Sequence, residues 1–135
     1  MPGFFTRFGW EYRRAGHDEF LTGFSGERGS WDIHVKVSDL AVTFSISPYV
    51  TRGDGPPGPH LLRTILLANH ELNLAKLGVN EDDEVCLSVE IPADGFEYSQ
   101  FNDALTAIAY YADDYKERLD AVVAEDEDVE AQGVV

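Results

Sequence analysis

The sequence predicts an α+β fold in which helices pack on one face of an antiparallel sheet. Several short segments alternate apolar and polar residues with a period of two, the pattern of a strand with one buried and one solvated face. Two longer segments repeat apolar residues every three or four positions, as amphipathic helices do. At 135 residues, with 44% hydrophobic residues, the chain is expected to form one domain with its own core.

The strand pattern occurs in four segments, which are residues 20–24, 31–37, 40–46 and 85–91. Apolar residues such as Ile33 and Phe44 take every second position in these segments. We expect Pro48 to end the third strand and Pro92 the fourth, because proline cannot donate a ladder hydrogen bond. Before the first strand, the chain is expected to turn around Gly16.

Three segments are expected to be helical. Phenylalanines within residues 4–8 share one face of a short helix or turn. A second helix covers residues 61–72, with Pro59 in its first turn and Gly78 as a signal that the chain has left the helix. The longest helix covers residues 98–122, where apolar residues recur at steps of three and four without a break.

The domain boundaries follow from composition. Residues 51–59 are rich in proline and glycine and are expected to form an exposed loop. Residues 1–123 are predicted to form the single domain, and residues 124–135 an acidic, disordered tail, because that segment has few large apolar residues and many acids.

The net charge of −15 is unevenly placed along the chain. Residues 1–80 hold eight acidic and eight basic residues, whereas residues 81–135 hold seventeen acidic and two basic residues. An acidic surface repels phosphate backbones, so direct binding of nucleic acid is disfavoured. The acidity is compatible with a basic protein partner, with imitation of nucleic acid by the C-terminal part, or with simple solubility.

The sequence predicts a reduced, cytoplasmic protein that does not enter a membrane. It contains no apolar run of about 18 residues, and its N-terminus lacks the pattern of a secretory signal. Cys86 is the single cysteine, which excludes an intrachain disulfide and a zinc site built from several cysteines.

No motif in the sequence predicts catalysis, a metal or a cofactor. The spacing of Gly23, Gly26 and Gly29 fits neither a dinucleotide-binding nor a phosphate-binding loop, so these are interpreted as turn glycines. His70 and Glu71 lack the second histidine of a zinc protease. We therefore expect a protein that is not an enzyme.

The long helix is the candidate interaction surface, because its apolar arc is wider than one buried stripe requires. Tyrosine is favoured at protein interfaces for its amphipathic ring. The candidate dimer or partner contacts are Tyr98, Phe101, Leu105, Ile108, Tyr111 and Tyr115. The alternative is that both sides of this helix are buried within one subunit.

Several segments resemble the bacterial YbjN-like proteins, whose fold is similar to that of type III secretion chaperones. The resemblance covers residues 4–120 and consists of packing and turn signatures rather than catalytic ones. The segments that carry it are Phe8-Gly9-Trp10 with Tyr12, residues 21–31, residues 61–92, and the end of the long helix near Asp114 and Tyr115.

This resemblance implies helices on one antiparallel sheet, commonly in a homodimer, and a surface that engages a cytoplasmic protein client. Some YbjN-like proteins are connected with regulation of motility, stress responses and sensory transduction. The sequence therefore predicts a non-catalytic, chaperone-like or adaptor protein. The alternative is a small-ligand-binding regulatory domain with a pocket lined by Trp10, Trp31 and Tyr49.

Overall fold

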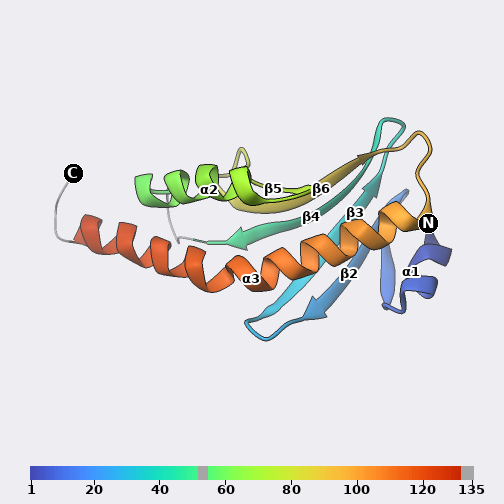
Figure 1. The fold of residues 1–135 in the computed structure, drawn as a ribbon, viewed down its shortest axis with the longest axis horizontal. Coiled ribbons are helices and arrows are strands. Elements are labelled where there is room, and N and C mark those ends of the chain that lie inside the picture. The colour runs from blue at the N-terminus through green and yellow to red at the C-terminus, as the bar shows by residue number, and fades with distance from the viewer. Residues whose placement is uncertain (52–54, 132–135) are drawn as a thin grey trace.

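The computed structural model describes residues 1–51 and 55–131, which form one six-stranded antiparallel sheet with three helices on one face (Figure 1). The strand order is β1-β2-β3-β4-β6-β5. This architecture confirms the predicted fold class. The elements are α1 (Pro2–Phe8), β1 (Tyr12–Gly16), β2 (Glu19–Ser25), β3 (Ser30–Val37), β4 (Ala41–Val50), α2 (Pro59–Glu71), β5 (Ala75–Val79), β6 (Val85–Pro92) and α3 (Tyr98–Ala131).

The core lies between the sheet and α3, which runs along most of the molecule's length (Figure 1). The register places Val35 opposite Phe44 and Phe44 opposite Val89, so the three central strands contribute side chains to the same buried face. From the opposite side, Phe101 of α3 packs edge-on against Phe44 with ring centroids 5.7 Å apart. The alternation seen in the sequence is thus the alternation between this core and the open face.

Helix α1 is held by aromatic contacts rather than by its own length. Seven residues are too few for a stable isolated helix. The ring of Phe5, which is fully buried, stacks on Tyr12 of β1 at 4.8 Å and meets Phe101 of α3 edge-on at 5.0 Å. These contacts fix α1 beside the first strand and the start of α3.

Two strands were not predicted, and each lacks the usual signal for a physical reason. All five residues of β1 are exposed, so no apolar alternation marks it. The turn expected around Gly16 is confirmed, and it follows this strand at residues 17–18. In β5, Gly78 is a strand residue and not the exit from a helix. Only Ala75 and Leu77 of this strand are buried, which leaves too short an apolar pattern to recognise.

Strand β4 continues past Pro48 to Val50, so the prediction that Pro48 ends it was wrong. The pairing of β4 with β6 is irregular between Ile46 and Val50. A proline is tolerated where the ladder is interrupted, because no hydrogen bond needs its missing N–H.

The prediction of a disordered tail at residues 124–135 was also wrong as far as the structure describes it, because α3 extends to Ala131. Residues 132–135 lie outside the described residues. Asp126 of this segment is buried, as is Val123 just before it. The composition of the segment concealed this packing, since most of its acids are exposed and one is not.

Asp126, near the end of α3, caps the N-terminus of α2. The N-cap residue of α2 is Gly58, which has no side chain to accept a hydrogen bond from the first turn of the helix. The Asp126 carboxylate, 3% exposed, accepts hydrogen bonds from the backbone N–H of His60 at 3.1 Å and of Leu61 at 3.0 Å. It also contacts Nδ1 of the His60 ring at 2.7 Å. A Cβ at Gly58 would lie 2.4 Å from the Asp126 carboxyl carbon, so this cap requires glycine there.

We expect Asp126→Asn to lower the free energy of unfolding by about 1–3 kcal/mol, because the charged cap of α2 is lost within a buried site. Urea unfolding followed by circular dichroism measures this change. The matched control is Glu127→Gln, which neutralises the exposed neighbouring acid and should leave stability nearly unchanged. Equal stability of the two variants would contradict the capping role.

The cap also predicts how stability depends on pH. Burial alone would raise the pKa of Asp126, but the hydrogen bonds from Leu61 and His60 outweigh it and hold the pKa below its ordinary value of 3.8. The stabilisation is therefore complete above that ordinary value and is lost as the pH falls through the lower pKa of the folded state. The stability difference between wild type and Asp126→Asn should shrink on acidification, and a constant difference would refute the assignment.

Candidate functional site

The six residues predicted as dimer or partner contacts do not form one exposed surface. Four of them are buried within the single chain, and these are Phe101, Leu105, Ile108 and Tyr115. The other two, Tyr98 and Tyr111, are half-buried. The contact of these six residues with a second chain stays a prediction, and the accessible part of it is limited to the two tyrosines.

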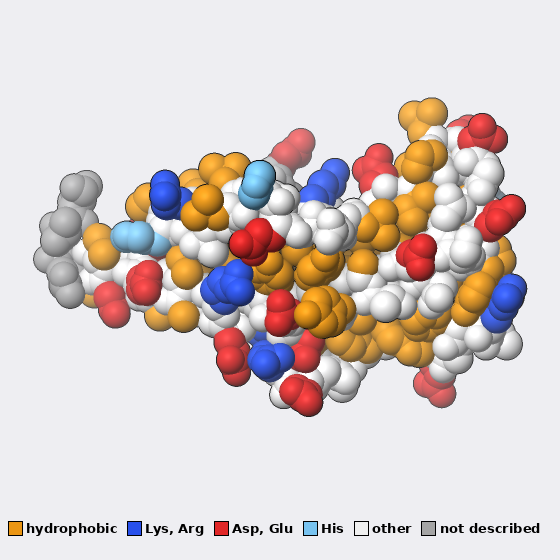
Figure 2. All heavy atoms as spheres, in the orientation of Figure 1, with side chains coloured by type: hydrophobic (Ala, Val, Ile, Leu, Met, Phe, Trp, Pro, Cys, Tyr) orange, Lys and Arg blue, Asp and Glu red, His pale blue; other side chains and the backbone are white. Residues whose placement is uncertain are grey.

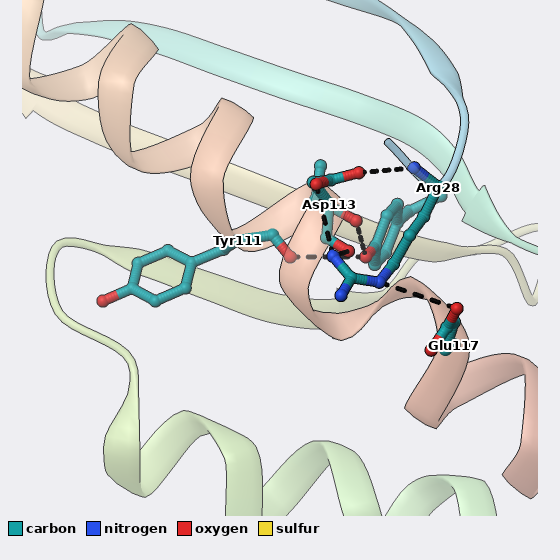
Figure 3. Close-up of polar contacts among 6 residues, drawn as sticks. Arg28, Tyr111, Asp113 and Glu117 are labelled. Carbon is teal, nitrogen blue, oxygen red and sulfur yellow. Dashed lines mark hydrogen bonds and ion pairs between the residues drawn. The ribbon is translucent and has the colours of Figure 1, made fainter. Parts of the chain in front are cut away.

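The middle of α3 joins three other parts of the fold. The hydroxyl of Tyr49, at the end of β4, donates to the carbonyl of Ala112 at 2.5 Å, and burial raises the pKa of that phenol above its ordinary value. The Tyr111 hydroxyl accepts the backbone N–H of Asn73, just before β5. Asp113 holds the turn between β2 and β3 through Arg28 (Figure 3).

The Arg28 contacts show how firmly this turn is tied to α3. Oδ1 of Asp113 accepts the backbone N–H of Arg28 at 2.8 Å, and Oδ2 lies 3.3 Å from Nη1 of the guanidinium. The Nε atom lies 3.6 Å from Oε1 of Glu117, one helical turn further along (Figure 3). Both carboxylate oxygens of Asp113 therefore contact Arg28, so this side chain has a structural role and is not a free acid for proton transfer.

The aromatic residues of the predicted ligand pocket do not meet in one cavity. Trp31 and Tyr49 are core side chains, with ring centroids 6.3 Å apart. Trp10 stacks on Phe24, whose ring lies between it and Trp31, and it borders a shallow hollow of about 520 Å³ that is lined by neither Trp31 nor Tyr49. Within residues 1–51 and 55–131, no group of three or more His, Cys, Asp or Glu side chains is arranged to hold a metal ion.

Exposed apolar side chains gather instead on α2 and its connection to β5. Figure 2 shows them over α2, beside basic and histidine side chains. We define the α2 patch as the exposed leucines of this region, which are Leu62, Leu66, Leu67 and Leu74. Leu66 is 72% and Leu67 57% exposed. Large exposed apolar groups of this kind are typical of interaction surfaces.

Leu74 of the α2 patch has an unusual backbone conformation. Its backbone adopts the left-handed region, with a φ of 68°, and its side chain is 51% exposed. This conformation is unfavourable for a bulky residue and persists only where the surrounding structure imposes it. A strained backbone that presents an apolar side chain to solvent is a feature found at functional surfaces.

The sequence contained a signal for the α2 patch that the analysis of helical spacing missed. Five of the seven residues from Leu61 to Leu67 are leucine or isoleucine, more than one buried face of a helix accommodates. Only Leu61 and Ile65 of these are buried. Apolar residues beyond those of one buried face are therefore exposed on α2, whereas most of the apolar residues of α3 are buried in the core.

The two edges of the sheet differ in their accessibility. At β5, the side-chain amide of Asn69 in α2 pairs with the backbone of Leu77, donating to its carbonyl at 2.8 Å and accepting its N–H at 2.7 Å. Asn69 thus takes the place of a peptide group on the outer side of that strand. At β1, by contrast, every residue is exposed, and no other strand or helix of the described chain pairs with its outer side.

A strand edge of this kind binds another extended chain through main-chain hydrogen bonds. It requires no catalytic group, metal or cofactor. The structure thus offers two surfaces for macromolecules, an edge strand at the α1 end of the sheet and the α2 patch. None of the described helices is both long and apolar enough to cross a membrane.

Comparison with known proteins shows the fold. No family model matches the chain, and no curated protein does. Solved structures match at low identity, and two of them are compared below. One is the type III secretion chaperone SycH of Yersinia pestis in complex with a stable fragment of YscM2, with a TM-score of 0.53, 16% identity, and coverage of 82% of this chain and 92% of that chain.

The second is from the heterodimeric ExoU–SpcU complex of the type III secretion system of Pseudomonas aeruginosa, with a TM-score of 0.57 and 11% identity. The match covers 89% of this chain and 94% of that chain. Identities this low carry no assignment of function, but the coverage of both chains is nearly complete. The chain therefore has the fold of the type III secretion chaperones.

Proposed function

We propose that the protein is a non-catalytic, chaperone-like or adaptor module that binds an extended segment of a protein client at the outer edge of β1. The observation that carries the proposal is the contrast between the open edge at β1 and the edge at β5 that Asn69 covers. The fold supports it, because both similar structures are complexes with another protein. The cytoplasmic location and the YbjN-like membership remain predictions from the sequence.

The geometry of an edge strand explains how such a client is held. The N–H and C=O groups of a strand point alternately to its two sides, so half of those of β1 face away from β2. An added strand would use these outward groups without disturbing the pairing of β1 with β2. Because main-chain bonds supply the affinity, the client needs an extended segment rather than a folded surface.

The variants Arg13→Pro and Arg14→Pro test this proposal, and they are matched because each removes one positive charge from β1. One of the two prolines removes an N–H that bonds β2 and should lower the melting temperature. The other removes an outward N–H and should leave the melting temperature nearly unchanged. Affinity capture from the native lysate, with mass spectrometry, should then show that this second, stable variant loses the client that the wild type retains.

Two outcomes would contradict strand addition. The first is retention by the stable proline variant of every protein that the wild type captures, which would place the binding site elsewhere. The second is capture of nothing by the wild type above the level of an untagged lysate. A hydrogen-exchange measurement on the captured complex, showing new protection within residues 12–16, would independently support the assignment.

We also propose that the protein forms a homodimer through the α2 patch. The charges beside the patch favour a second copy of the chain as its occupant. Arg63, Leu67 and Glu71 lie at steps of four on one exposed stripe of α2. If two copies of α2 pack antiparallel about a two-fold axis at Leu67, Arg63 of each copy faces Glu71 of the other, and the leucines bury one another.

Leu67→Asp should convert the dimer to a monomer without unfolding it, because that side chain is exposed in the single chain and becomes buried in the interface. Analytical ultracentrifugation at micromolar concentration measures the change. The control is Leu40→Asp, at a position 86% exposed in the turn between β3 and β4, which should leave the dimer intact. A monomeric wild type would refute the proposal.

A further inference from the structure

Positive charge is concentrated beside the β1 edge. Helix α1 and strand β1, residues 2–16, carry three arginines and one acid in a chain whose net charge is −15. The arginines are Arg7, Arg13 and Arg14, and none of them forms an ion pair with another described residue. Arg28, Lys36 and Lys116, by contrast, each have an acidic partner.

The two arginines of β1 lie on opposite faces of the sheet. Arg14 is opposite Phe20, a core residue, and its guanidinium lies 5.2 Å from the centre of that ring. Arg13 is opposite Leu21 and borders the hollow on the open face. A strand added beside β1 would therefore place its alternate side chains next to one arginine or the other.

The two faces do not contribute equally to selectivity. The hollow beside Arg13 is also lined by Glu11 and Asp32, which offset its charge. The surroundings of Arg14 are aromatic, with Phe20 and Tyr12 in edge-on contact and Phe5 stacked on Tyr12. Arg14 is exposed like Arg13, but its contacts in the described chain are aromatic and not acidic, so an acidic side chain facing Arg14 gains more than one facing Arg13.

We propose that the β1 edge selects an extended client segment with acidic residues at alternate positions, and that Arg14 is the main determinant of this selection. The inference rests on the proposed strand addition at the same site. It assigns a chemical class to the client: an acidic segment, not a basic or purely apolar one. An otherwise acidic chaperone-like protein would thereby bind acidic segments at one sheet edge and repel them from the rest of its surface.

The test is an NMR titration of the full chain with three short peptides. The first alternates glutamate with threonine, the second replaces each glutamate with glutamine, and the third is the glutamate peptide with every backbone nitrogen methylated, so that neither of its edges can donate a hydrogen bond. The amide signals of residues 12–16 should shift with the glutamate peptide. Its affinity should exceed that of the glutamine peptide by roughly three- to tenfold, as expected for one or two favourable cross-strand charge pairs.

Variants then separate the two arginines. Arg14→Gln should remove most of the preference for glutamate over glutamine, and Arg13→Gln only a smaller part of it. Added salt should reduce the affinity for the glutamate peptide more than that for the glutamine peptide. The methylated peptide should not bind, because its backbone cannot complete the ladder.

Each failure has a distinct meaning. Equal affinity for the glutamate and glutamine peptides, with shifts at residues 12–16, would overturn the charge inference and leave strand addition standing. Binding of the methylated peptide at the level of the glutamate peptide would overturn strand addition itself. Absence of binding by any peptide, or a preference that survives in Arg14→Gln, would overturn the assignment of the acidic class to this edge.

Discussion

The packing of α3 along the apolar face of the sheet fixes the positions of nearly all the other elements. Phe101 near its start contacts Phe5 of α1 and Phe44 of β4, and Tyr49 and Arg28 are held near its middle. Its last turns support α2 through Asp126. Within the described residues no second layer of helices or strands covers the opposite face of the sheet, and the two ends of the sheet expose different groups.

A division of roles along the sheet follows from this arrangement. At one end of the sheet, Asn69 pairs with the outer side of β5 at Leu77, and the α2 patch exposes leucines. Such a surface suits contact between the side chains of two folded proteins. At the other end, β1 offers backbone groups and arginines, which suits an extended chain. The two proposed modes of binding use different atoms and do not compete for the same surface.

The sequence predicted the fold class because four strands and the two longer helices bury one face each, and periodicity reports burial. The prediction from periodicity failed where a segment buries no residue, and where the burial of a residue depends on a distant part of the chain. Strand β1 buries nothing, so it leaves no pattern, and the burial of Asp126 depends on α2, more than sixty residues earlier, which no local pattern reports. The exposed part of a helix could not be located from the sequence for a related reason: spacing shows that a helix has a wide apolar arc, but not which part of that arc the rest of the fold covers. Ile108 and Leu66 have the same kind of spacing, and only the tertiary structure distinguishes them.

The cap that Asp126 places on α2 has a consequence for synthesis of the protein. The two partners of this contact, Leu61 and Asp126, are 65 positions apart in the sequence. While the ribosome is still adding α3, α2 lacks its cap and the apolar face of the sheet lacks its cover. The domain can therefore reach its final state only after Asp126 has been synthesised, and until then its core strands remain uncovered.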